Sequence, residues 1–151
     1  MHNTTLKIGV SGYIGSGKSV GSAALALPAG DLIVADSVAK ELMKNDRFIH
    51  RRLRETFGNE VVGTDTIFFD RLGGKVFSSR EELDKLNAIV HPPLLKRLRD
   101  LLNTSAKRKC VLDAALIPFW GIEDWFDLRI WVRASVETRV RRLMARDSQS
   151  R

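Results

Sequence analysis

Gly12-Tyr13-Ile14-Gly15-Ser16-Gly17-Lys18-Ser19 has the spacing Gly-x-x-x-x-Gly-Lys-Ser, which is typical of a phosphate-binding loop. Its glycines let the backbone turn so that successive N–H groups point inward, toward a string of anionic oxygens. Lys18 is expected to meet the β- and γ-phosphates, and the Ser19 hydroxyl to bind Mg²⁺. The phosphate-binding residues are therefore expected to be Gly12, Gly15, Ser16, Gly17, Lys18, Ser19 and Val20.

The segments on either side of this loop agree with that interpretation. Leu6–Val10 has the apolar character of a short buried strand, and Val20–Leu27 that of a helix of small residues. A nucleotide-binding loop of this type requires the order strand, loop, helix. The spacing is not Gly-x-Gly-x-x-Gly, so a dinucleotide-binding fingerprint is excluded. The alternative is an ordinary glycine-rich turn between a strand and a helix.

Size and composition point to one soluble globular domain. The chain has 151 residues, of which 44% are hydrophobic and 28% charged. No apolar run has the length of a membrane span, and the N-terminus lacks the apolar core of a signal peptide, so a cytoplasmic location is expected. The single cysteine, Cys110, lies in an apolar stretch and is expected to be buried.

The net charge of +7 is concentrated toward the C-terminus. Seven arginines follow residue 128, against Glu137 and Asp147. Most of these arginines fall on a predicted helix without the interleaved aromatic residues that stack on bases, so no nucleic-acid partner is expected. Beside a phosphate loop they favour a clamp on nucleotide phosphates, and a solvated basic face is the alternative.

Strand and helix patterns alternate along the chain, which predicts an α/β fold with a parallel sheet of about four strands and helices on both faces. Strands are expected at 6–10, 31–35, 109–115 and 128–132. Helices are expected at 20–27, 37–44, 47–57, from 71, from 81 to 90, at 94–102 and at 136–146. Asp70 is expected to cap the helix from 71, Ser78 and Ser79 to cap the next, and His91-Pro92-Pro93 to break it.

Several stretches beyond the loop resemble the dephospho-CoA kinase family along nearly the whole chain. They are Gly9–Ser19, Ile33–Leu42, Phe57-Gly58, Asp70–Leu72, Val76-Phe77, Leu86–Pro92, Val111–Leu116 and Arg142–Asp147. The resemblance implies transfer of the γ-phosphoryl of ATP to the ribose 3′-hydroxyl of dephospho-CoA, with Mg²⁺. It also implies a P-loop three-layer fold in one domain, 1–151, with a helical substrate cap at 47–105 and the start of a lid at 136–151.

The resemblance also implies roles for individual residues. Asp36 would orient the attacking hydroxyl, although an aspartate at that position is also a suitable helix N-cap. Arg71 and His91 match positions that face the acceptor, and a structural histidine before proline is the alternative for His91. Arg142 and Arg146, four residues apart on one helix face, match the lid arginines. Lys18, Asp36, Arg142 and Arg146 are thus the expected catalytic set. Asp113 could bind Mg²⁺ through water, and the resemblance gives it no firm role.

The chain departs from the family pattern at three places. Val34 stands where the family usually carries a second acidic residue, and Leu116-Ile117-Pro118-Phe119-Trp120 replaces a run that commonly ends in glutamate. The chain also stops at Arg151, so the C-terminal strand and helix of the family, including the adenine-holding loop, are expected to be missing.

These departures leave two other functions open. One is a different small-molecule or nucleoside monophosphate kinase, and the other is a truncated, non-catalytic nucleotide-binding protein. An uncovered sheet edge would favour self-association. No membrane partner is expected.

Overall fold

The computed structural model describes residues 5–149 and divides into two compact units. The first unit contains the chain up to Ala35 and again from Arg99 onward, and the second contains Asp36–Leu98. The division of the chain into a phosphate-binding core, a cap and a lid stays a prediction, and residues 150 and 151 of the predicted lid lie outside the described residues.

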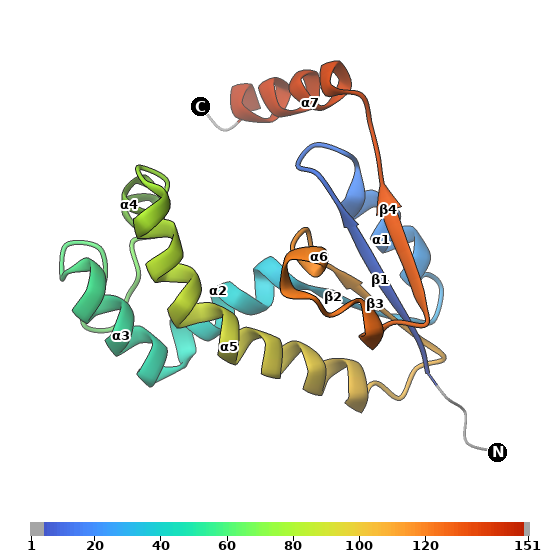
Figure 1. The fold of residues 1–151 in the computed structure, drawn as a ribbon, viewed down its shortest axis with the longest axis horizontal. Helices are drawn as coiled ribbons and strands as arrows, with labels where there is room; N and C mark the ends of the chain where they lie inside the picture. Colours follow the sequence, from blue (N-terminus) through green and yellow to red (C-terminus); the bar gives the residue numbers. More distant parts are fainter. Residues whose placement is uncertain (1–4, 150–151) are drawn as a thin grey trace. The chain divides into compact units, whose positions relative to one another are not determined.

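The first unit is built on a four-stranded parallel sheet with the strand order β2-β3-β1-β4 (Figure 1). The strands are β1 (Leu6–Gly12), β2 (Asp31–Val34), β3 (Lys109–Asp113) and β4 (Leu128–Val132). The central strand β1 is buried from Ile8 onward, because it has a hydrogen-bonded neighbour on each side. The predicted α/β class and the predicted four parallel strands are confirmed.

The two faces of β1 have different partners, since successive side chains of a strand point to opposite faces. Ile8 and Val10 form a cluster with Val111 of β3 and Ala26 of helix α1 (Lys18–Ala26). Gly9 points the other way, where a side chain would overlap the ring of Phe126 at 2.8 Å. The absence of a side chain at residue 9 therefore lets an aromatic ring pack directly on the backbone of the central strand.

Three further helical segments belong to the first unit. These are α6 (Ile117–Trp120), the 3₁₀ helix η1 (Glu123–Trp125) and α7 (Val136–Gln149). The predicted helix at the C-terminal end is confirmed as α7. The segments α6 and η1 were not predicted, because helices of three or four residues are too short to show a periodic pattern. Pro118 in the first turn of α6 has the fixed backbone angle that suits a helix start.

The second unit is helical. It contains α2 (Ala35–Asn45), α3 (Arg47–Phe57), α4 (Phe69–Val76) and the greater part of α5 (Arg80–Thr104). Asp46 caps α3 by accepting hydrogen bonds from the N–H groups of Phe48 and Ile49 at 2.9 and 3.1 Å. The buried face of α3 carries Ile49, Leu53 and Phe57, so its arginines are left on the exposed faces.

Three expectations about these helices were wrong in detail. α5 runs unbroken through Pro92 and Pro93, because packing of Val90, Leu94 and Leu98 in the core compensates for the two lost N–H donors. α4 begins at Phe69, so Asp70 lies inside its first turn rather than at its cap. Of the two serines, only Ser79 caps α5, through the N–H of Glu82 at 3.2 Å, while the Ser78 hydroxyl binds the carbonyl of Lys75.

Within residues 5–149, none of the helices combines the length and the apolar character needed to cross a membrane.

Candidate active site

The loop after β1 has the backbone conformation that a phosphate cradle requires. Gly17, directly before α1, has φ of 93°, a left-handed conformation that glycine adopts without strain. Gly12 at the end of β1 has φ of 153°, and a side chain there would meet the carbonyl oxygen of Val132 at 2.5 Å. The loop is closed by a hydrogen bond from the N–H of Ser16 to the carbonyl of Tyr13, at 3.1 Å. The curled loop backbone and the N-terminus of α1 together form a site that suits an anion.

The first residue of α1, Lys18, forms an ion pair with Asp113 at the end of β3. Asp113 pairs with Val10 in the sheet and so lies on the face that α1 covers. The lysine side chain is 17% exposed and the aspartate side chain only 1%. The loop lysine therefore has a buried carboxylate as its partner.

Two buried oxygens, one in the loop and one at the end of β3, have no hydrogen-bond partner among residues 5–149. They are the Ser16 hydroxyl and the second carboxylate oxygen of Asp113. A buried polar atom without a partner is costly, and such atoms at a functional site are commonly completed by a ligand, an ion or water. Ser19 and Val20, in the same first turn of α1, are exposed.

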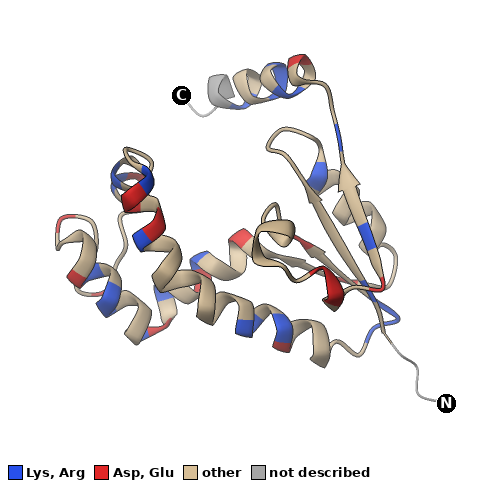
Figure 2. Ribbon diagram, in the orientation of Figure 1, with Lys and Arg blue, Asp and Glu red and all other residues tan. Residues whose placement is uncertain are grey.

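Helix α7 contributes two arginines to the loop. The guanidinium of Arg142 donates a hydrogen bond to the carbonyl of Gly15 at 3.1 Å. The guanidinium of Arg139 lies 5.0 Å from the ring centre of Tyr13, which in turn packs edge-on against Trp131. Arg146 lies one helical turn beyond Arg142 and is exposed. Figure 2 shows basic residues along α7, the segment that follows β4.

The remaining predicted site residues belong to the second unit. Asp36 is exposed in the first turn of α2, one residue inside the helix, so it is not at the N-cap position. Arg71 of α4 donates to the carbonyl of Glu60 at 3.1 Å and lies 4.9 Å from the centre of the Phe68 ring. His91 lies within α5, and its partial burial lowers the pKa of its imidazole. Their roles toward a substrate stay predictions.

A magnesium ion fits the residues at the loop. In the described part of the chain there is no group of three or more histidine, cysteine, aspartate or glutamate residues that could enclose a metal. Mg²⁺ in phosphate-transfer sites does not need such a group, since it keeps several waters and takes ligands from the substrate phosphates. The Ser19 hydroxyl and the unpartnered oxygen of Asp113 are oxygen donors of the kind that Mg²⁺ prefers.

The structure thus brings one part of the predicted site together. The loop residues Gly12 to Val20 and Arg142 belong to one unit, whereas Asp36, Arg71 and His91 belong to the other. Sequence reasoning gave Asp113 no firm role and did not single out Arg139. A signal for Asp113 was present, because it ends an apolar strand pattern, where the side chains of a parallel sheet meet a bound ligand.

The family model described as dephospho-CoA kinase matches residues 6–151. The chain is 34% identical over 147 residues to a dephospho-CoA kinase of Geobacillus kaustophilus, covering 95% of this chain and 73% of the relative. It is 36% identical over 141 residues to that of Streptomyces avermitilis, covering 92% and 69%.

Two solved structures are similar as well. The crystal structure of TT1252 from Thermus thermophilus has a TM-score of 0.77 at 31% identity, covering 95% of this chain and 73% of that one. A dephospho-CoA kinase from Campylobacter jejuni has a TM-score of 0.61 at 18% identity, covering 97% and 82%, and shows the likeness of the fold.

Proposed function

We propose that this chain, which belongs to the dephospho-CoA kinase family, transfers the γ-phosphoryl group of ATP to the ribose 3′-hydroxyl of dephospho-CoA. This reaction is the final step of coenzyme A biosynthesis. The observation that carries the proposal is that the loop holding Lys18 is also contacted by Arg142, which donates a hydrogen bond to the carbonyl of Gly15. Phosphoryl transfer depends mainly on positioning and on neutralising charge, and these two cations serve both needs.

On the donor side, the loop N–H groups and Lys18 hold the β- and γ-phosphates of ATP. The guanidinium of Arg142 donates a hydrogen bond to the loop at the carbonyl of Gly15, and Arg146 follows it on the same helix. Two guanidinium groups spaced by four residues can bind the same polyphosphate, because each offers a planar pair of donors. Mg²⁺, held by Ser19 and through water by Asp113, would supply further neutralisation of the phosphate charge.

On the acceptor side, Asp36 accepts or orients the proton of the attacking hydroxyl. Its exposure in the first turn of α2 leaves the carboxylate accessible to a substrate. Arg71 offers a cation and His91 an imidazole with a lowered pKa, which is therefore neutral near pH 7 and able to accept or donate one hydrogen bond. A cytoplasmic location and self-association remain predictions.

The test is release of ADP by the 151-residue chain with Mg-ATP, in the presence of dephospho-CoA, AMP or shikimate. We expect stimulation by dephospho-CoA alone, and loss of that stimulation in Lys18→Ala with the thermal stability measured in parallel. Stimulation by AMP instead would indicate a nucleoside monophosphate kinase. Binding of ATP without turnover on any acceptor would indicate a non-catalytic nucleotide-binding protein.

A second variant separates chemistry from structure on the acceptor side. Asp36→Asn keeps the size of the side chain and removes its charge, so we expect the turnover rate to fall by at least about a hundredfold while the affinity for ATP is kept. A variant with lower thermal stability and an unchanged rate would show that Asp36 acts only on helix α2.

A further inference from the structure

Helix α7 packs on the phosphate loop at a residue that has no side chain. A Cβ atom at Gly15, where φ is 75°, would lie 3.0 Å from the carbonyl oxygen of Arg139 and 3.2 Å from its Cα. The first turn of α7 therefore packs directly against the loop backbone. The hydroxyl of Ser135 caps this turn by accepting a hydrogen bond from the N–H of Thr138 at 3.2 Å.

The side chain of Arg139 is held at the loop by an aromatic ring. Its guanidinium carbon lies 5.0 Å from the ring centre of Tyr13, the second residue of the loop. Trp131 of β4 packs edge-on against the same ring, with 5.4 Å between the ring centres. The Nε atom of Arg139 is buried and has no hydrogen-bond partner among the described residues. The attraction of the cation to the electron-rich ring therefore fixes this side chain where a hydrogen bond does not.

Arg142 reaches the loop from the same side of α7 as Arg139, because the two residues are three apart on the helix. Its guanidinium donates to the carbonyl of Gly15 at 3.1 Å, beside the place where the backbone of Arg139 packs. Arg141 lies between them in the sequence and pairs instead with Glu137 at 3.4 Å, on an exposed face. The loop contacts of α7 thus depend on one face of the helix.

We propose that the contact between Tyr13 and Arg139 holds α7 against the loop and thereby positions Arg142 for the polyphosphate of the nucleotide, an inference that rests on the proposed function. Arg139 is then a positioning residue. A guanidinium that the helix keeps beside the loop only exchanges the Gly15 carbonyl for a phosphate oxygen. A guanidinium on a detached helix must first be brought to the site, and the entropy lost in that step weakens binding.

The test is equilibrium binding of a non-hydrolysable ATP analogue with Mg²⁺, measured by calorimetry. Arg139→Gln removes the cation and Tyr13→Leu removes the ring, so each should weaken binding by about fivefold, the loss expected for one cation–π contact. Arg139→Lys and Tyr13→Phe keep the cation and the ring, so their affinities should stay within about twofold of the wild type. The variant with both Arg139→Gln and Tyr13→Leu should bind no more weakly than either single variant, because both lose the same contact.

A second measurement separates positioning of Arg142 from a merely structural role of Arg139. Arg139→Gln is combined with Arg142→Ala, and the analogue is titrated again. If Arg139 acts through Arg142, its substitution should change the affinity by less than about twofold once Arg142 is absent. Losses of affinity that add in this double variant would overturn the proposal, since Arg139 would then act without Arg142.

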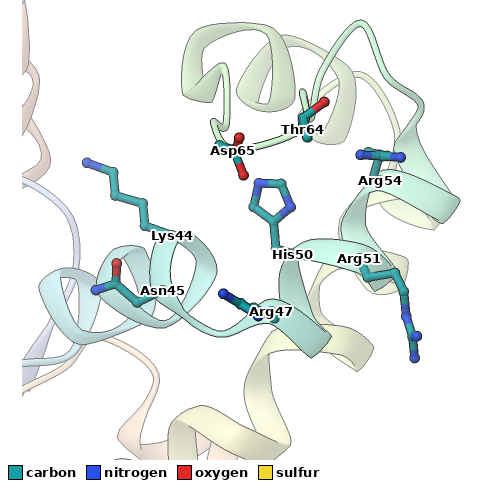
Figure 3. A pocket seen from close by; sticks show the side chains of 8 residues that line it. All are labelled: Lys44, Asn45, Arg47, His50, Arg51, Arg54, Thr64 and Asp65. Carbon is teal, nitrogen blue, oxygen red and sulfur yellow. The ribbon is translucent and has the colours of Figure 1, made fainter.

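Two exposed arginines are the controls for the loss of a positive charge. Arg141→Gln changes the same helix. Arg51→Gln changes α3 of the second unit, at a pocket of about 590 Å³ where Figure 3 shows the guanidinium of Arg51 pointing away from His50. Both variants should keep the thermal unfolding temperature of the wild type and an affinity for the analogue within about twofold of it.

The other outcomes contradict the proposal in different ways. Wild-type affinity in both Arg139→Gln and Tyr13→Leu would overturn the positioning role and leave the proposed function standing. Equal weakening by Arg141→Gln would overturn it as well, because the effect would then come from the net charge of α7 and not from the contact with Tyr13. Absence of analogue binding and of turnover in the wild type would overturn the proposed function itself.

Discussion

Asp113→Asn changes the charge beside the phosphate loop without changing the size of the side chain. Asp113 is 2% exposed and is the ion-pair partner of Lys18. A phosphate that binds Lys18 must compete with Asp113 for the lysine ammonium group, and it then lies next to the aspartate carboxylate. We therefore expect the variant to bind Mg-free ADP more tightly than the wild type, because one competitor for Lys18 and one repelling charge are removed.

The size of the effect follows from the geometry of the pair. A phosphate oxygen on the Lys18 ammonium would lie about 5 Å from the carboxylate, and Coulomb repulsion there amounts to about 3 kcal/mol at an effective dielectric constant of 20. Lys18 is partly exposed, at 17%, so water screens some of this interaction. A range of about 1.5 to 3 kcal/mol corresponds to a gain in affinity of roughly tenfold to a hundredfold.

The assay is calorimetric titration with ADP, in EDTA and then in Mg²⁺. If Asp113 holds Mg²⁺ through water, the added metal should improve ADP affinity less in the variant than in the wild type. Asp100→Asn, a loss of the same charge on an exposed face of α5, is the control and should leave both affinities unchanged. Equal Mg-free affinities of Asp113→Asn and wild type would refute the view that the ion pair opposes nucleotide binding.

Three further predictions concern the backbone, a histidine and the cysteine. Gly12→Ala should lower the free energy of unfolding in urea by about 2 to 4 kcal/mol, since the new side chain meets the Val132 carbonyl at 2.5 Å. The control Gly21→Ala should not lower it, because a methyl group at residue 21 would have its nearest neighbour at 4.0 Å. Because burial lowers the pKa of His91, the unfolded chain takes up a proton more readily, so stability should be full above about pH 6.5 and fall on acidification. Unfolding measured from pH 7.5 to 5 should show a weaker decline in His91→Gln. Cys110 is fully buried and burial raises the pKa of its thiol, so an aromatic disulfide reagent at pH 8 should react at a rate limited by unfolding, and rapid reaction of the native protein would contradict this.

Local sequence signals were sufficient for most of the fold. The loop at Gly12–Ser19 predicts strand, loop and helix together, and each of the four strands is a short apolar run between turn residues. The helix break predicted at Pro92 was wrong. Helix propensity depends on neighbouring residues alone, whereas α5 is also stabilised by core contacts with residues distant in the sequence.

The site was harder to predict than the fold. Lys18 and Arg142 follow from motifs, but the ion pair of Lys18 with Asp113 depends on the order in which β1 and β3 pair, which no spacing encodes. The contact of Arg139 with Tyr13 depends likewise on how α7 returns to the loop. The family resemblance predicted substrate-binding roles for Asp36, Arg71 and His91, and these roles stay predictions that the acceptor assays test.

The contact between α7 and the phosphate loop has a kinetic consequence. Arg142 hydrogen-bonds the carbonyl of Gly15, and its guanidinium lies 3.2 Å from the point where a side chain of residue 17 would begin. We expect an arriving nucleotide to displace this arginine from the Gly15 carbonyl before its phosphates bind. The observed association rate should then level off at high nucleotide concentration, at the rate at which Arg142 leaves Gly15, and Arg142→Ala should restore a linear dependence in stopped-flow measurements. The same arginine would then slow both the association and the dissociation of a bound polyphosphate, so slower binding is accompanied by a longer residence time.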